Sequence, residues 1–146
     1  MSFKNILVPT DGSEYTKEAV RRAMELAKLV GGKVTALYVL DQTILTNMPM
    51  DTAVMNVYNT LEKEGKDAVD FVRDLGAQEG VEVELSIKEG TPVKVILDES
   101  PNYDIIVMGT LGRTGMSKLL MGSVAERVVR ASLCPVMVVR SPEASN

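Results

Sequence analysis

Apolar residues follow two kinds of pattern along this chain: short continuous runs and longer stretches with helical spacing. The continuous runs are typical of strands that are buried on both faces of a sheet, and they cover residues 6–9, 34–40, 105–108 and 136–139. A fifth stretch, 81–88, alternates apolar residues with charged or polar ones. This period of two predicts a strand with one solvated face, at the edge of the sheet.

Between these strands lie stretches in which the apolar residues have helical spacing. The i, i+3, i+4, i+7 pattern predicts helices that begin near residues 14, 54, 92 and 124 and end near 30, 75, 100 and 131. Their ends carry recognisable signals: Ser13 as an N-cap, Gly31-Gly32 and 76–80 as stops, Thr91-Pro92 as a start, and a capping box from Ser123 to Glu126. Residues 41–51 show neither pattern and are expected to be irregular.

Strands therefore alternate with helices along the chain. This order predicts an α/β fold: a single doubly wound domain, Rossmann-like or flavodoxin-like, with a five-stranded parallel sheet and helices on both faces. The length of 146 residues is that of one domain. We expect the domain to span residues 1–140 and to be followed by a polar C-terminal tail, 141–146.

The composition excludes several classes of chemistry. The chain has no histidine and one cysteine, so a Ser-His-Asp triad, a histidine-based zinc site and a thiolate metal site are all excluded. Any metal would be held by oxygen ligands, as Mg²⁺ usually is. No apolar run reaches the roughly 18 residues of a membrane span, and the first apolar run is too short for a secretory signal. We therefore expect a cytoplasmic protein without a membrane partner.

The net charge of −4 is spread unevenly. Acidic residues dominate between residues 51 and 105, and such a surface does not suit nucleic acid, so no nucleic-acid partner is expected. Basic residues are in excess from residue 106 onward. This excess hints at an anionic ligand, although charge alone is explained more simply by a solvated helix face.

Glycines in the last third of the chain point to phosphate binding. Ligands of doubly wound sheets bind beyond the carboxyl ends of the strands, where this chain has 9–13, 40–41 and 109–115. Gly109 and Gly112 follow a buried strand, and Gly122 and Ser123 stand at a helix start, where free N–H groups suit a phosphate. Arg113 and Lys118 lie between and add positive charge. Each glycine alone could serve only a turn, but together they favour a phosphate site.

These residues resemble the universal stress protein family, in its ATP-binding branch. The family's ATP motif, G-x₂-G-x₉-G-[ST], is met by Gly109, Gly112, Gly122 and Ser123. The resemblance covers nearly the whole chain, including ILVPTDGS at 6–13, YVLD at 38–41, DIIVMG at 104–109 and CPVMVV at 134–139. One position departs: Leu111 stands where family members often carry histidine, which affects nucleotide selectivity rather than the backbone phosphate cradle.

The resemblance implies a role for each matching residue. Phosphates would be bound by Gly112, Gly122, Ser123 and Val124, with Arg113 nearby and Gly109 against the ribose. The adenine and ribose pocket would be lined by Pro9, Thr10, Asp11, Val39 and Met108. The implied ligand is ATP, with Mg²⁺ bound through its phosphates. The implied partner is a second copy of the chain, paired through strand 136–139.

Three functions remain open at this point. The first is an ATP-binding stress-response or signalling module that changes conformation or partner binding with nucleotide occupancy. The second is a slow ATPase or phosphotransferase, which would need a group that positions water near the γ-phosphate. The third is an interaction protein that binds no nucleotide, for which Leu111 is the one supporting residue.

Overall fold

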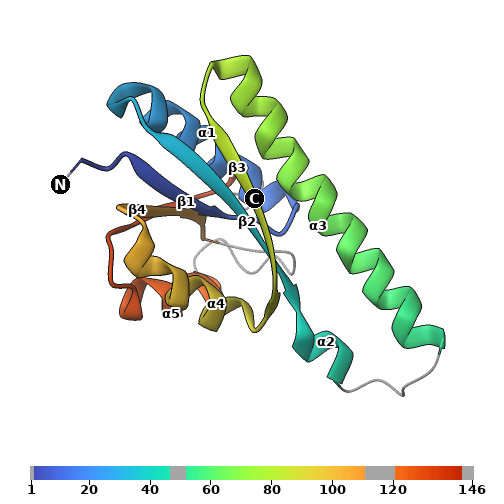
Figure 1. Ribbon diagram of the computed structural model, residues 1–146. Helices are drawn as coiled ribbons and strands as arrows, with labels where there is room; N and C mark the ends of the chain where they lie inside the picture. Colours follow the sequence, from blue (N-terminus) through green and yellow to red (C-terminus); the bar gives the residue numbers. More distant parts are fainter. Residues whose placement is uncertain (1, 47–51, 111–120, 143–146) are drawn as a thin grey trace.

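The computed structural model describes residues 2–46, 52–110 and 121–142, and these form a five-stranded parallel sheet between two layers of helices (Figure 1). The strand order is β3-β2-β1-β4-β5. The strands are β1 (Asn5–Pro9), β2 (Lys33–Asp41), β3 (Val83–Gly90), β4 (Ile105–Gly109) and β5 (Val136–Val139). The order and the two helical layers confirm the expected doubly wound α/β fold.

Helices connect the strands. They are α1 (Glu14–Val30), α2 (Gln42–Thr46), α3 (Thr52–Glu79), α4 (Pro92–Glu99), the short 3₁₀ helix η1 (Ser100–Asn102) and α5 (Ser123–Ala131). Helix α1 ends at Gly31 in the left-handed conformation, with φ of 66°, as the Gly31-Gly32 pair predicts. Thr91 and Pro92 begin α4, also as predicted.

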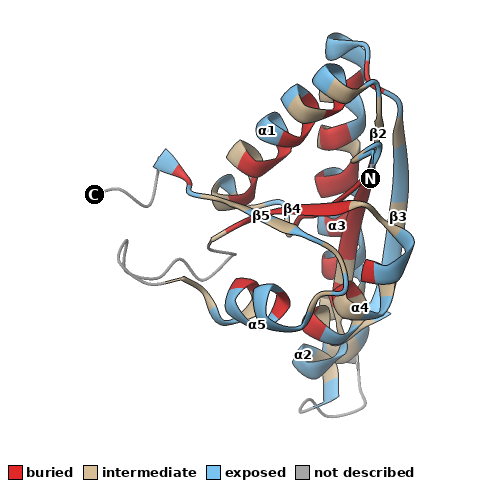
Figure 2. Ribbon diagram, turned by 90° about the vertical axis from the view of Figure 1, so that its left-hand side faces the viewer, coloured by how far each residue is buried: buried red, intermediate tan, exposed pale blue. Residues whose placement is uncertain are grey.

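The alternation of side chains along β1 divides the core between the two faces of the sheet. Figure 2 shows the buried residues in the central strands and along one side of α1. Ile6 and Val8 pack in the cluster under α1 and α3. Leu7 belongs to the cluster under α4 and α5, with Ile96 and Val128. Because β1 is central and its residues 6–8 are buried, its sequence has no polar face, as expected for a parallel strand covered on both sides.

Strands β3 and β5 form the two edges of the sheet. The alternating stretch 81–88 was expected to be an edge strand, and the position of β3 confirms this. Leu85 and Ile87 on β3 remain 41% and 43% exposed, because an edge strand is covered less fully than its neighbours.

The expectation of irregular structure over 41–51 is wrong for its first part. Residues 42–46 form helix α2, while 47–51 lie outside the described residues. The carboxylate of Asp41 explains this start, because its Oδ1 accepts hydrogen bonds from Thr43 N at 3.0 Å and Thr43 Oγ1 at 2.6 Å. Helix α2 is therefore marked by a side-chain hydrogen bond at its start. With five residues it is too short to show the apolar periodicity of a longer helix.

Helix α3 ends at Glu79, just before Gly80, which lies within the stop predicted at 76–80 and a few residues beyond the end expected near residue 75. Two of its glycines are needed for packing rather than for ending the helix. A Cβ on Gly65 would lie 2.5 Å from Cδ2 of Tyr38, and a Cβ on Gly76 would collide with Val83. Glycine at these positions lets α3 lie close against β2 and β3.

Replacing Gly65 by alanine is therefore expected to destabilise the protein. Alanine gains about 1 kcal/mol in helix propensity, but its methyl group must displace the buried ring of Tyr38, and such overpacking costs about 1–3 kcal/mol. Urea unfolding should show a lower free energy of unfolding. The exposed Lys63 on the same helix gives the control, Lys63→Ala, which should change little. Increased stability of Gly65→Ala would contradict this account of the glycine.

None of the helices in the described residues has the length and hydrophobicity of a membrane-spanning segment. Ser141, the first residue of the predicted tail, is buried, and 143–146 lie outside the described residues. The tail therefore stays a prediction.

Candidate functional site

A cleft of about 380 Å³ opens at the carboxyl ends of β1, β2 and β4. In this sheet the chain runs from β1 to β2 and β3 on one side, then crosses to β4 and β5 on the other. The strand order thus reverses between β1 and β4, which is where doubly wound folds bind ligands. The N-terminus of α5 closes one end of the cleft.

The structure brings together nine of the eleven residues that the sequence places in the binding site. All nine line the cleft: Pro9, Thr10, Asp11, Val39, Met108, Gly109, Gly122, Ser123 and Val124. They come from four segments that are far apart in the sequence. The other two, Gly112 and Arg113, lie outside the described residues, as do Leu111 and Lys118.

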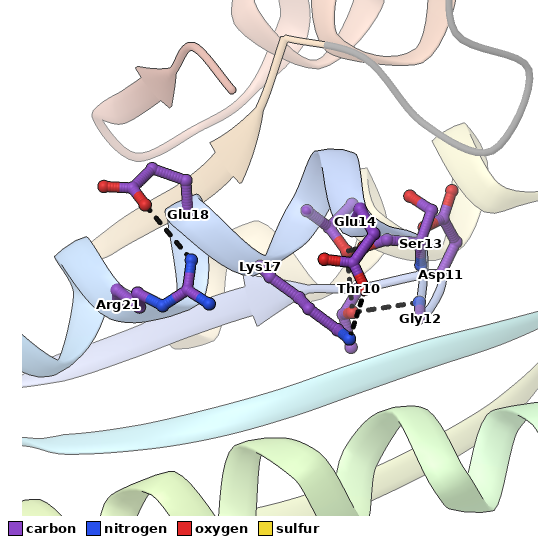
Figure 3. A network of polar contacts seen from close by, with 9 residues as sticks. Thr10, Asp11, Gly12, Ser13, Glu14, Lys17, Glu18 and Arg21 are labelled. Atoms are coloured by element: carbon purple, nitrogen blue, oxygen red, sulfur yellow. Dashed lines mark hydrogen bonds and ion pairs between the residues drawn. The ribbon is translucent and has the colours of Figure 1, made fainter. Parts of the chain in front are cut away.

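Thr10 organises the loop between β1 and α1 (Figure 3). Its Oγ1 accepts a hydrogen bond from Gly12 N at 3.1 Å and lies 3.1 Å from Thr16 Oγ1. Thr16 uses its own proton to bond Ser13 O at 2.9 Å, so Thr10 donates to Thr16. The hydroxyl of Thr10 is thus satisfied inside the protein, and its role in the cleft is to shape the wall.

Thr10→Val is expected to loosen this loop. Valine keeps the shape but leaves Gly12 N and Thr16 Oγ1 without their partner, and an unsatisfied group of this kind costs about 1–3 kcal/mol. The free energy of unfolding in urea should fall by that amount. Thr10→Ser retains the hydroxyl and should remain close to the original protein; equal losses for both variants would contradict the role of the hydroxyl.

Ser13 occupies the N-cap position of α1, but its side chain makes no capping bond. The backbone N–H of Ser13 instead donates to Asp11 Oδ1 at 2.9 Å, which closes the turn and orients the Asp11 carboxylate. Figure 3 shows Asp11 and Ser13 side by side at the start of α1. Gly12 between them has φ of +80°, a conformation that favours glycine.

The capping box predicted at Ser123 is wrong by one residue. The N-cap of α5 is Gly122, and no side-chain capping bond is present. Gly122 N donates to Thr110 O at 2.7 Å, and Glu126 N donates to Gly122 O; this fixes Gly122 as the residue before the helix. Ser123 is therefore the first helical residue, with an exposed side chain. The first N–H groups of α5 have no acceptor within the helix and lie at the cleft.

At the opposite end, β2 extends past β1. Thr10 N donates to Leu37 O at 2.9 Å, and the paired register of β1 and β2 ends at Pro9 and Leu37. Val39 lies two residues further along β2, so its backbone N–H and C=O face the same side as those of Leu37. They are directed over the end of β1, at a residue that lines the cleft.

Sequence reasoning missed several residues of the cleft wall. Ile44 of α2, Leu61 of α3, and Pro92 and Ile96 of α4 all line it. Each belongs to a helix whose position against the strand ends is set by tertiary packing, and no local motif marks them. For Pro92 the helix-start signal was present, but it located α4 and not the cleft.

A hydrogen bond between α3 and β3 holds the carboxyl end of β3 beside this wall. Tyr58 of α3 donates to Glu89 of β3, and Glu89 is paired with Leu40 of β2. The hydrogen bond to Glu89, followed by partial burial and the nearby negative charge, raises the pKa of Tyr58. The phenol therefore stays protonated as a donor at neutral pH.

Known proteins are similar to this chain in sequence and in fold. The model of the universal stress protein family matches residues 2–140. Universal stress protein MJ0531 of Methanocaldococcus jannaschii is 37% identical over 143 residues, which cover 97% of this chain and 84% of that protein.

Solved structures agree with this match. The hypothetical protein MJ0577, the subject of a structure-based assignment of biochemical function, has a TM-score of 0.82 at 30% identity, over 95% of this chain and 96% of that one. A universal stress protein in complex with cAMP has a TM-score of 0.70 at 22% identity, over 97% and 99% of the two chains, and at that identity shows the fold alone. By sequence over almost its whole length, and by fold, this chain belongs to the universal stress protein family.

Proposed function

We propose that this protein binds an adenine nucleotide, ATP with Mg²⁺, in the cleft at the strand ends, and that occupancy changes its conformation or its binding of a partner in a stress response. The observation that carries the proposal is the meeting of nine motif-derived residues in one cleft. The cleft has an open helix N-terminus at one end and largely apolar walls at the other. Such a division suits a molecule with a charged and an aromatic end.

The phosphates belong at the N-terminus of α5. Gly122, Ser123 and Val124 line the cleft there, and the backbone N–H groups of the first turn suit an anion, reinforced by the positive end of the helix dipole. The exposed hydroxyl of Ser123 adds a donor. We assign Gly112 and Arg113 to the same phosphates on the family motif alone, with Gly109 against the ribose.

The adenine belongs at the end formed by β2. Pro9, Val39 and Met108 supply apolar surface for the ring. The backbone N–H and C=O of Val39 offer a donor beside an acceptor, which matches adenine, where the N1 acceptor lies beside the N6 donor. Asp11 lies between the two ends, in the loop after β1, in position for the ribose and the base edge, and Thr10 beside it lines the pocket.

Relatives with bound ligands support the class of nucleotide. One universal stress protein was solved in complex with cAMP. Another, from Arabidopsis thaliana, was solved with AMP bound; it is 19% identical with a TM-score of 0.65, over 98% of this chain and 95% of that one. Both ligands share the adenosine moiety and differ in their phosphates, as expected if adenosine recognition is the common element of the cleft.

Mg²⁺ would be bound through the phosphates of ATP. Among residues 2–46, 52–110 and 121–142, no group of three or more acidic, histidine or cysteine side chains is arranged to hold a metal. Oxygen atoms of the triphosphate are ligands that Mg²⁺ favours. On this basis ATP affinity should depend on Mg²⁺, whereas AMP affinity should not.

We also propose a homodimer formed through β5. Among the described residues this strand pairs with β4 alone and forms an edge of the sheet, with the sequence VMVV. The backbone groups on its outer side are suited to pairing with a second copy. Leu133 and Met137 add apolar surface beside it, 78% and 39% exposed. A charged or proline-containing edge would have opposed such pairing.

The nucleotide proposal is tested by identifying what the protein carries. Purified protein is denatured, and the released small molecules are separated and identified by mass. We expect adenine nucleotide at close to one molecule per chain. A guanine nucleotide in its place would refute adenine as the ligand, and release of a flavin or nicotinamide would refute the assignment of the cleft. Turnover of added ATP, assayed on the same sample, separates a switch from a slow ATPase.

A further inference from the structure

Asp41 places a carboxylate at the base end of the cleft. It is the last residue of β2 and lines the cleft with Val39. Ile44, Pro92 and Ile96, which line the cleft near it, are apolar, and Tyr38, which also lines the cleft, is 2% exposed with its ring against Gly65 of α3. Asp41 is therefore the side chain of this group that can accept a hydrogen bond from a ligand.

Helix α2 fixes the orientation of this carboxylate. Oδ1 accepts from both Thr43 N and Thr43 Oγ1, at 3.0 and 2.6 Å. Within the part of the chain that the structure describes, no hydrogen bond or ion pair is formed by Oδ2. One oxygen thus anchors the side chain, while the other keeps its acceptor capacity for a group in the cleft.

The position of Asp41 determines which part of a nucleotide it would meet. β2 is separated from β4 by β1, so it lies about 10 Å from the strand that leads to the phosphate end. At that distance a carboxylate does not lie against the phosphates, which it would repel. It faces the part of the ligand bound over β2, the base.

We propose that the Asp41 carboxylate selects a 6-amino purine over a 6-oxo purine. This inference rests on the proposed binding of a nucleotide with its base over β2. A carboxylate only accepts hydrogen bonds, and the amino group at position 6 of adenine donates them. The oxygen at position 6 of guanine or hypoxanthine is an acceptor and would be repelled. The second N–H of the adenine amino group remains available to the carbonyl of Val39.

The test compares three nucleotides that differ at position 6: ATP, inosine triphosphate and purine riboside triphosphate, which has no group there. Titration calorimetry with emptied protein and Mg²⁺ is carried out on the original protein and on Asp41→Asn. Asparagine keeps an oxygen for Thr43 but offers an NH₂ where Oδ2 stood. We expect the original protein to favour ATP over inosine triphosphate by about tenfold or more, and Asp41→Asn to reduce that ratio by about tenfold. Affinity for purine riboside triphosphate should stay the same.

Each alternative outcome is distinct. If Asp41→Asn weakens all three nucleotides equally, the carboxylate contacts the ribose, and the inference is wrong while nucleotide binding stands. An unchanged ratio of ATP to inosine triphosphate also overturns it. If the original protein binds none of the three, the proposed function fails and this inference with it. Asp74→Asn, on an exposed part of α3, is the matched control and should match the original protein with every nucleotide.

Discussion

Replacing Gly122 by leucine should reduce ATP affinity by about 100-fold or more while leaving the fold intact. Gly122 lines the cleft at the N-cap of α5, so a leucine side chain there would occupy the space of a phosphate. Losing two hydrogen bonds to a charged group costs about 3 kcal/mol, which corresponds to roughly 100-fold in affinity. The backbone tolerates the change, because φ of −63° and ψ of 156° are open to any residue.

The measurement is a calorimetric titration of both proteins with ATP and Mg²⁺, beside circular dichroism and urea unfolding. Arg127→Leu adds the same side chain to an exposed position of the same helix and should bind ATP like the original protein. If Gly122→Leu folds normally and binds ATP with unchanged affinity, the phosphates do not lie at α5, and the site assignment is wrong.

Val138→Pro should convert the proposed dimer to a monomer. Ile106 N donates to Pro135 O and Thr110 N donates to Val139 O, so alternate residues of β5 face β4. Val138 is out of phase with them, and its backbone N–H points to the free edge. Proline at this position removes an outward donor and leaves the bonds to β4 intact, which is where a sheet tolerates proline.

Sedimentation velocity at micromolar concentration distinguishes the two states. Val138→Thr retains the N–H and the β-branched shape and should remain a dimer. A Val138→Pro protein that sediments like the original dimer would show that the copies associate elsewhere, and an original protein that is monomeric would remove the dimer proposal altogether. Neither result would bear on the nucleotide cleft.

Most of the fold could be predicted because its three central strands, β1, β2 and β4, are buried on both faces. The runs at 6–9, 34–40 and 105–108 are recognisable without any tertiary information. The strand order was not predictable locally, since it depends on which crossovers pack together. The alternation of apolar and polar residues in 81–88 was the one local pattern that indicated a strand at the edge of the sheet.

The same local signal has more than one use in this chain, which limits how finely it locates the end of an element. Glycine ends α1 at Gly31, where φ is positive. Helix α3 passes through Gly76, which allows close packing on Val83, and ends before Gly80, within the predicted stop 76–80. Ser123 and Glu126 have the spacing of a capping box, but the bond from Gly122 N to Thr110 O sets the helix start one residue earlier.

For the cleft, sequence reasoning identified the strand-end residues and missed the helical wall. The carboxyl ends of parallel strands meet at the same edge of the sheet, so every loop that follows an apolar run is a candidate for the binding site. Ile44, Leu61 and Ile96 reach the cleft only through the packing of α2, α3 and α4. Asp41 is an intermediate case: its place after a strand was recognisable, but the bond to Thr43 that orients it belongs to a helix with no periodic signal.

Titration of the emptied protein with ATP and Mg²⁺ by isothermal calorimetry is the decisive test of nucleotide binding in the cleft. The protein is unfolded to remove any resident nucleotide, refolded, and checked by circular dichroism before titration. We expect one site per chain with micromolar affinity, weakened when Mg²⁺ is omitted and weakened about 100-fold or more in Gly122→Leu. Absence of measurable heat and of competition by AMP, in a refolded protein with its native spectrum, would contradict nucleotide binding and leave an interaction protein as the function to pursue.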